Sequence, residues 1–477
     1  MLKKSCSALL ISLIVAGSGS IFPALIAQVR IPQIDYKERT LANGLKVYSV
    51  RNTSSPTVAI NVWYKVGSKD DPANRSGFAH LFEHMMFKAT KNMKPETFDR
   101  LTEDVGGYNN ASTWPDYTYY HEVVPSNYLE TLLWAEADRM GSLVVEDSFF
   151  KSERDVVEEE YRQRVLAQPY GRLFYLLLNT RSYTTHPYKR PTIGSIEDLE
   201  AATIDDVRAF HATYYRPDNA VLIVVGDFDQ KQLDAWVDKY FAGIPRPDKP
   251  VPRVQSKEPE RRAEQRFTEY GPNVPLPAVA ITYLVPPAAS SDAMPLQIAE
   301  AILSAGESSR LYQSLVYEQQ IAQEAFASYD RREDESLFYL GAILASGKRP
   351  DEAERALLAE VTRMQQQPVA AAELDKVKNQ LITSALRERE TNNGKAEAIG
   401  YAVTMYGDAA RVNTDLDRLR AVTAADVQRV MQKYFTAANR VVISYQQETR
   451  QPAGDKAGAR SGPQPDSVGA ARKGGTR

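Results

Sequence analysis

The sequence predicts an α+β fold built from two homologous copies of one layered domain. Segments rich in β-branched and aromatic residues, such as 57–64 and 117–124, alternate with segments of helical periodicity, such as 128–143 and 148–166. This alternation is typical of a sheet covered by helices. The chain has 477 residues, which is more than one hydrophobic core usually supports, so at least two domains are expected.

Six residues recur with a constant displacement of 220 positions, which indicates an internal duplication. The pairs are Ile196 and Leu416, Leu199 and Leu419, Thr203 and Thr423, Val207 and Val427, Tyr214 and Tyr434, and Asn219 and Asn439. A strand-like segment follows each asparagine, at 220–225 and at 440–445. Two ordinary helix starts could resemble each other by chance, but six positions in register favour duplication.

The composition divides the chain into two domains, a linker and two terminal segments. The first domain is predicted at 28–244, and the second at 267–448. The proline-rich and charged segment 245–266 fits a linker. The tail 449–477 has almost no large apolar residue and is predicted to be disordered.

The first 27 residues have the pattern of an export signal peptide. Lys3 and Lys4 precede an apolar run at 8–16, and Ala27 is one candidate cleavage position. Cleavage predicts an exported protein, periplasmic or secreted in a bacterium, with no stable membrane span, whereas retention of the prolonged apolar run would give a membrane anchor. The only cysteine, Cys6, lies inside this segment, so the mature chain has no disulfide or thiolate. The net charge of -3 argues against a nucleic-acid partner.

His80, Glu83 and His84 form the most informative motif because they share one face of a helix predicted at 77–88, with Ser76 as its candidate N-cap. Two imidazoles at positions i and i+4 can bind one metal ion, and the acid beside them is placed to take a proton from water. H-x-x-E-H is the inverse of the zinc-peptidase order H-E-x-x-H. Three fixed positions can also arise by chance, so the assignment requires a third ligand.

The remaining histidines are not obvious third ligands. His121 lies in an aromatic strand, His186 precedes Pro187, and His211 lies in the repeated helix. Each is more readily explained as a structural residue. The chain has no histidine after His211, so the second copy cannot hold the same site.

Carboxylates on the helix predicted at 148–166 are better candidates. Glu153 and Glu160 lie at the two ends of an apolar stripe that includes Val156. A charge on a face that turns toward the core is costly unless it is paired, and a bound dication removes that cost. Glu158 and Glu159 point elsewhere and predict a solvated acidic face.

His80, Glu83 and His84, followed by Glu160 at 76 positions after His84, resemble the motif of the pitrilysin/insulinase-type zinc metallopeptidases. The Glu-Arg-x-x-Val-x-x-Glu form of 153–160 also matches, as do Gly106-Gly107 and Asn110-Ala111-Ser112-Thr113. The resemblance covers roughly residues 35–448 and is to the short two-domain class, which includes mitochondrial processing peptidase subunits. It implies that each domain is a mostly antiparallel sheet packed with helices, as in half of a pitrilysin-type clamshell.

The resemblance implies a metal centre in the first domain. His80, His84 and Glu160 would bind one zinc ion per chain, and Glu83 would act as the general base. Glu153 would orient a ligand histidine from outside the ligand set, as metal-bound imidazoles usually require.

The resemblance also implies residues that hold the substrate. The edge at Asn110 and Ala111 would bind an extended peptide by strand addition. Arg310 and Tyr317, seven positions apart in the zinc-free second domain, match a substrate-gripping pair. A helix-surface arginine and a packing tyrosine are the structural alternative.

These residues predict a zinc-dependent endopeptidase that hydrolyses peptides or small unfolded proteins in extended form. Long members of the family join four such domains, whereas this chain has two, so a closed chamber requires two chains. A homodimer is expected, with a heterodimer containing a related subunit as the alternative. A non-catalytic or structural subunit of a related complex is the competing function, although such proteins typically lose the ligands or the base.

Overall fold

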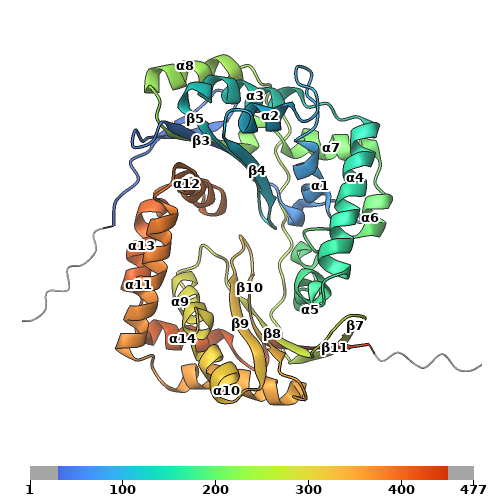
Figure 1. Cartoon of the computed structure of the whole chain (residues 1–477), viewed down its shortest axis with the longest axis vertical. Coiled ribbons are helices and arrows are strands. Elements are labelled where there is room, and N and C mark those ends of the chain that lie inside the picture. The colour runs from blue at the N-terminus through green and yellow to red at the C-terminus, as the bar shows by residue number, and fades with distance from the viewer. Residues whose placement is uncertain (1–30, 449–477) are drawn as a thin grey trace, which may run out of the picture. The chain divides into compact units, whose positions relative to one another are not determined.

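Two β-sheets organise the described part of the chain, residues 31–448, in the computed structural model (Figure 1). Residues 34–448 belong to one compact unit. The predicted signal peptide, Cys6 and the predicted disordered tail lie outside the described residues. None of the helices within 31–448 is long and apolar enough to cross a membrane.

The N-terminal sheet has six strands in the order β1-β2-β6-β3-β5-β4. The strands are β1 (Lys37–Thr40), β2 (Lys46–Arg51), β3 (Thr57–Tyr64), β4 (Tyr108–Thr113), β5 (Thr118–Pro125) and β6 (Ala220–Gly226). Only β2 and β6 pair in parallel, and the other neighbours are antiparallel. Strand β4 lies at the edge of this sheet.

The C-terminal sheet repeats this topology without a counterpart of β1. Its order is β7-β11-β8-β10-β9, with one parallel pair, β7 and β11. The strands are β7 (Gln265–Gly271), β8 (Ala278–Val285), β9 (Ala322–Asp330), β10 (Ser336–Leu344) and β11 (Arg440–Gln447). Each sheet is therefore mostly antiparallel, which confirms the predicted fold class.

The repeated residues make the same contacts in the two halves. Asn219 donates from Nδ2 to the carbonyl of Tyr214 at 2.8 Å, and Asn439 donates to the carbonyl of Tyr434 at 2.7 Å. The repeated threonines each cap a helix through a reciprocal capping box with an aspartate three residues later. The displacement of 220 positions therefore reflects equivalent positions in two similar structures.

Fourteen α-helices in residues 31–448 cover the sheets. In the first half they are α1 (Phe78–Met85), α2 (Thr97–Glu103), α3 (Leu129–Ser142), α4 (Asp147–Tyr161), α5 (Leu178–Ser182), α6 (Ile196–Glu200), α7 (Ile204–Tyr214) and α8 (Gln230–Phe241). In the second half they are α9 (Ala293–Ser304), α10 (Pro350–Gln366), α11 (Ala371–Glu388), α12 (Asn392–Tyr406), α13 (Arg411–Ala421) and α14 (Ala424–Tyr434). Three π-helical segments also occur, at Arg162–Leu166, Arg172–Leu177 and Tyr312–Glu318.

Each half contributes helical residues to the sheet of the other half. Helix α12 packs on β3 and β6, where its Ile399 and Val403 join Trp63 in one core cluster (Figure 1). In return, Leu173 and Leu178 of the first half lie in a core cluster on the C-terminal sheet. Burial of apolar surface in these two clusters therefore stabilises the association of the halves.

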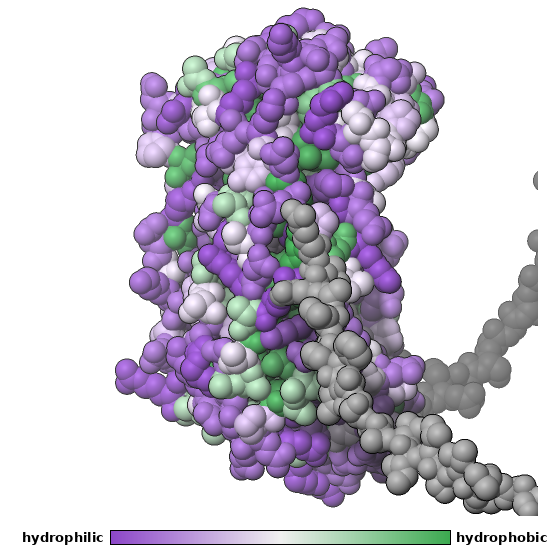
Figure 2. All heavy atoms as spheres, turned by 90° about the vertical axis from the view of Figure 1, so that its left-hand side faces the viewer, coloured by the Kyte–Doolittle hydropathy of each residue, from purple (hydrophilic) through white to green (hydrophobic). Residues whose placement is uncertain are grey.

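Buried charges also join the two halves. Lys69, which is 6 % exposed, lies 2.8 Å from Asp116 and 2.6 Å from Glu333 of the second half. The predicted linker is fixed by hydrogen bonds. Glu258 accepts from the backbone of residues 184–186, and Arg261 donates to the carbonyls of Thr282 in β8, Asn439 just before β11 and Ser182 in α5. The face that includes α11 and α13 is mainly hydrophilic, with apolar residues in small groups (Figure 2).

Candidate metal centre and active site

Helix α1 presents the metal motif on its partly accessible face. Phe78, Leu81 and Phe82 are fully buried and anchor the opposite face in the core. His80, Glu83 and His84 are only partly buried and lie beside α4 and β4. Three core residues at helical spacing thus fix the direction in which the polar side chains point.

The N-terminus of α1 is capped by Asp71 and not by the predicted residue, Ser76. The Asp71 carboxylate accepts from the backbone N–H groups of Gly77 at 2.7 Å and Ala79 at 2.8 Å. Ser76 donates to Asp198 at 2.6 Å. Burial raises the pKa of Asp71 to about 7, although the hydrogen bond from Ala79 opposes this shift. The prediction failed because the capping residue lies outside the local capping pattern.

Helix α4 supplies two glutamates on the side that faces α1. Glu153 is buried, and the side chain of Glu160 is 18 % exposed. The apolar stripe is narrower than predicted, because Val156 is 47 % exposed. The prediction of a solvated face holds for Glu159 but is wrong for Glu158, which is buried against Arg154 and Arg162.

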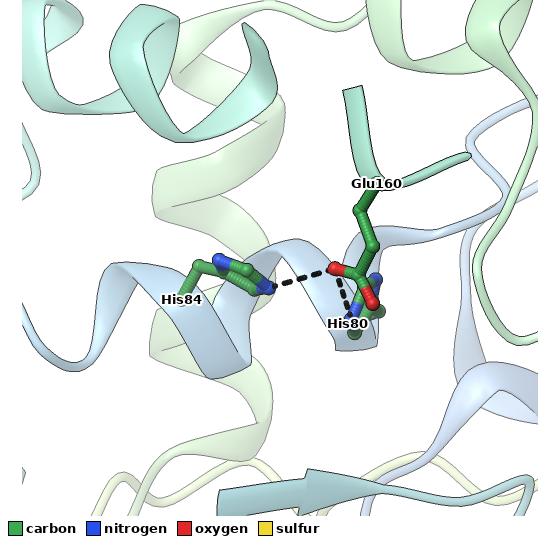
Figure 3. Close-up of side chains that lie close together, drawn as sticks. All are labelled: His80, His84 and Glu160. Carbon is green, nitrogen blue, oxygen red and sulfur yellow. Dashed lines mark ion pairs between the residues drawn. The ribbon is translucent and has the colours of Figure 1, made fainter. Parts of the chain in front are cut away.

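Glu160 lies between the two histidines of α1 (Figure 3). Its Oε2 atom is 3.6 Å from His80 Nε2 and 3.5 Å from His84 Nε2. These separations are long for hydrogen bonds. Two ligands about 2.0–2.1 Å from a tetrahedral zinc ion lie about 3.3–3.4 Å apart, so the observed spacing fits a shared ion. One donor atom from each of these three residues lies within 4.8 Å of the others.

The protonation of the two histidines differs because their surroundings differ. Burial lowers the pKa of His80 to about 4, and repulsion from His84 acts in the same direction. Burial also opposes the charged form of His84, but contacts with Glu153 and Glu160 outweigh it and raise the pKa to about 9. His80 is therefore neutral and ready to bind a metal near pH 7, whereas His84 must first lose a proton.

Contacts outside the three donor groups fix their orientation. Glu153 lies 3.6 Å from His84 Nδ1 and 2.7 Å from Lys88. Arg164 lies 3.0 Å from the second oxygen of Glu160. Burial would raise the pKa of Glu153, but His84 and Lys88 outweigh it and lower that pKa. A carboxylate on the far nitrogen of a metal-binding imidazole is the usual orienting arrangement.

Glu83 is held beside the donor cluster by Thr113, the last residue of β4. The Thr113 hydroxyl donates to Glu83 Oε2 at 2.5 Å, which leaves Oε1 without this partner. Burial raises the pKa of Glu83, and the hydrogen bond from Thr113 opposes the shift. A partly buried carboxylate with a raised pKa is suited to accept and return a proton. Thr113 belongs to the segment 110–113 that resembles the family, but its sequence position alone does not reveal the contact with Glu83.

Strand β4 brings a free sheet edge to this centre. Asn110 and Ala111 lie in the middle of β4, whose one strand partner within residues 31–448 is β5. The Ala111 N–H donates to the Asn110 side-chain oxygen at 2.8 Å. A strand that pairs with this edge would offer its own carbonyl oxygen to the Ala111 N–H in place of the Asn110 side chain.

The predicted substrate-gripping pair, Arg310 and Tyr317, is not in contact with the donor cluster within this chain. Arg310 donates from Nε and Nη2 to Glu373 of α11 at 2.9 Å and 2.7 Å. Glu373 stands 220 positions after Glu153 and thus in the same place in the duplicated helix. Tyr317 is 69 % exposed, so it is available to a molecule outside the chain.

The other histidines pack against aromatic or acidic side chains away from the donor cluster, as the sequence suggested. His211 stacks on Phe82 and Tyr215 behind the motif, and burial lowers its pKa to about 4. His121 stacks on Tyr119 on the opposite face of the sheet. His186 is buried and lies 3.2 Å from Asp334.

Comparison with known sequences identifies the class of protein. The profile described as "Insulinase (Peptidase family M16)" matches residues 46–195, and "Peptidase M16 inactive domain" matches 201–381. The chain is 32 % identical over 412 residues to the zinc protease PqqE of Helicobacter pylori, covering 86 % of this chain and 92 % of that protein. The chain therefore belongs to the insulinase family of peptidases, M16.

Further relatives agree in sequence and fold. The probable mitochondrial-processing peptidase subunit beta of Arabidopsis thaliana is 25 % identical over 405 residues, covering 83 % of this chain and 75 % of that one. The crystal structure of a Helicobacter pylori protease superimposes with a TM-score of 0.83 at 29 % identity, covering 87 % of this chain and 100 % of that one. The periplasmic protease PqqL of Escherichia coli matches with a TM-score of 0.70 at 19 % identity, covering 87 % of this chain and 48 % of that one.

Proposed function

We propose that this chain is a zinc-dependent endopeptidase that binds one zinc ion through His80, His84 and Glu160. The convergence of their donor atoms within 4.8 Å carries the proposal. Three protein ligands leave one zinc position open, which is typical of catalytic and not structural sites. Relatives that are named zinc proteases support the assignment.

The surrounding residues would carry out amide hydrolysis. A zinc ion at this site would supply a Lewis acid that polarises the scissile carbonyl and acidifies water. Glu83 Oε1 accepts the proton from the attacking water and returns it to the leaving amine, while Thr113 holds Oε2. The edge of β4 at Asn110 and Ala111 aligns the substrate backbone by strand addition, which favours extended peptides over folded proteins.

Replacing the base separates metal binding from hydrolysis. In Glu83→Gln we expect cleavage of an unstructured peptide to fall about 10²- to 10⁴-fold, with zinc content unchanged, because Glu83 is not a ligand. Zinc per chain is measured by atomic emission and cleavage by mass spectrometry. The control is Glu260→Gln, which changes an exposed glutamate in the same way and is expected to retain full activity.

A non-catalytic subunit is the competing function. Zinc-loaded protein that cleaves none of a panel of unstructured peptides would support it, as would equal activity in Glu83→Gln and the unchanged chain. The profile described as "Peptidase M16 inactive domain" covers 201–381, and Glu83 and the three proposed ligands all lie outside that range. That match therefore does not argue against a catalytic centre in the first half.

The working form is proposed to be a dimer of half-size chains, with a homodimer favoured and a heterodimer with a related subunit as the alternative. The similarity to a protein named as a subunit, and coverage of 48 % of PqqL, support pairing. Arg310 and Tyr317 of one chain would then hold a peptide at the zinc of the other. A periplasmic or secreted location is proposed from the predicted signal peptide, and PqqL, which is named periplasmic, supports it.

A further inference from the structure

A cavity of about 350 Å³ lies between the N-terminal sheet and the helices of the second half. Trp63 and Tyr119 line it from the sheet, and residues of α11, α12 and α13 line it from the other side. None of the four residues of the proposed catalytic centre lines this cavity. Its volume is at the small end of the range for ligand sites, so it fits a small molecule and not a long peptide.

Arg331 is the unusual residue of this cavity. Its side chain lines the cavity and is accessible to solvent. Within residues 31–448 no ion pair or hydrogen bond of its guanidinium is observed. It lies 5.4 Å from the centroid of the Tyr401 ring, and the charge of Glu300 favours its charged form without a direct contact.

A second arginine lines the same cavity, and its guanidinium is not fully paired. Arg389 has a buried Nη1 atom that lacks a hydrogen-bond partner. Burial lowers the pKa of Arg389, with Asp415 and Glu388 opposing the shift. A carboxylate is the geometrically matched partner for a guanidinium that has an unpaired N–H donor.

The acidic residues of the cavity already have partners of their own. Asp415 accepts from Arg411 at 2.6 Å, and Glu388 accepts from Ser384 at 3.3 Å. Glu397 accepts from Asn393 at 2.9 Å, and burial raises its pKa, which favours the neutral form. None of these carboxylates forms an ion pair with Arg331.

Aromatic rings form the wall that faces the second half. Trp63 stacks on Tyr119 with ring centroids 4.3 Å apart, and Tyr117 lies 4.9 Å from Trp63. Tyr401 meets Tyr117 edge to face at 6.1 Å. Such a surface favours a ligand with an aromatic or other flat apolar group.

We propose that this cavity binds a small carboxylate that carries an aromatic or apolar group, with Arg331 as the anchor of the carboxylate. A free amino-acid derivative and the C-terminal residue of a dipeptide present the same chemistry. The inference does not rest on peptidase activity, because binding is measured in the Glu83→Gln chain and requires no turnover.

The test compares matched ligands by the fluorescence of the tryptophans, since Trp63 lines the cavity. N-acetyl-phenylalanine is expected to bind about tenfold or more tightly than its C-terminal amide, and more tightly than inorganic phosphate. N-acetyl-leucyl-phenylalanine, compared with N-acetyl-phenylalanine, identifies which source of carboxylate is preferred. Equal affinity for the acid and the amide, or no binding of either acid, overturns the proposal.

Two substitutions locate the binding in this cavity. Arg331→Met is expected to weaken binding of the acid about tenfold or more. The control is Arg349→Met, which removes an exposed arginine elsewhere and leaves affinity unchanged. Ala398→Phe fills the cavity from α12 and leaves both arginines in the sequence, so it should also abolish binding. Unchanged affinity in a folded Arg331→Met or Ala398→Phe chain contradicts the assignment.

Discussion

His84 occupies the position in the metal centre at which protons and metal ions compete most directly. Its Nε2 atom faces Glu160, and its Nδ1 atom faces Glu153. Without a dication, the two carboxylates favour the protonated imidazolium. With one, Nε2 must be free of its proton, so metal binding and proton release are linked.

This linkage predicts how zinc affinity depends on pH. The pKa of His84 is raised to about 9 and that of His80 is lowered to about 4. Between these values His84 is protonated and His80 is neutral, so binding should release about one proton at pH 7, and affinity should rise about tenfold per pH unit up to about 9. Calorimetry of zinc binding in buffers of different ionisation enthalpy counts the proton. A count near zero at pH 7 contradicts this account.

The sequence predicted individual residues best where several constraints met at one point. His80, His84 and Glu160 converge, because α1 offers two donors at helical spacing and α4 turns one carboxylate toward them. It failed where a residue outside the local pattern decided the outcome, as at the N-terminus of α1, which Asp71 caps. The prediction for Glu158 was wrong for another reason: Arg154 and Arg162, four residues to either side, pair with it, and the sequence prediction did not consider these pairs.

At the scale of elements, strand positions followed from composition more reliably than the packing of helices. The strand expected at 57–64 is β3, and that expected at 117–124 differs from β5 by one residue at each end. Helical periodicity shows that α12 has buried residues, but it does not show which sheet they cover. The packing of α12 on the sheet of the other half could therefore not be predicted.

The contact between α12 and the N-terminal sheet depends on the absence of a side chain at Gly400. A Cβ atom there would lie 2.3 Å from the ring of Trp63, which is itself stacked on Tyr119 and cannot move freely. Gly400→Ala is expected to lower the free energy of unfolding by about 1–3 kcal/mol, because overpacking outweighs the helix propensity gained.

Urea unfolding measures this effect against a matched substitution. A Cβ atom at Gly243 would meet nothing within 4 Å, so Gly243→Ala should change stability by less than about 0.5 kcal/mol. If the two variants were equally stable, the close packing of α12 on β3 would be wrong.

At the scale of the whole molecule, one chain contains two complementary but separate parts. The donor cluster lies in the first half, whereas Arg310 and the exposed Tyr317 lie in the second. The duplication thus preserved the fold in both copies but the metal motif in only one. The repetition of one sheet topology in the two halves could be predicted because the repeated residues are local signals of helix starts and strands. The buried charge contacts of Lys69 between the halves could not.

The proposed homodimer predicts that two inactive variants restore each other. Glu83→Gln lacks the base and Arg310→Ala lacks the substrate grip, so each alone should be nearly inactive. After mixing and exchange of subunits, half of the dimers would contain one intact composite site, and activity should recover to about a quarter of the unchanged protein. Peptide cleavage during exchange measures the recovery. No recovery, despite exchange shown by light scattering of tagged chains, would argue against a site shared between two copies.

The central claim is that Glu160 completes a zinc site with His80 and His84, and a pair of adjacent substitutions tests it most directly. Glu160→Gln removes the proposed ligand, and Glu159→Gln makes the same change at the exposed neighbour. The account predicts that Glu159→Gln keeps one zinc ion per chain and its peptide cleavage, whereas Glu160→Gln loses both. Equal zinc content and equal cleavage in the two variants would contradict it.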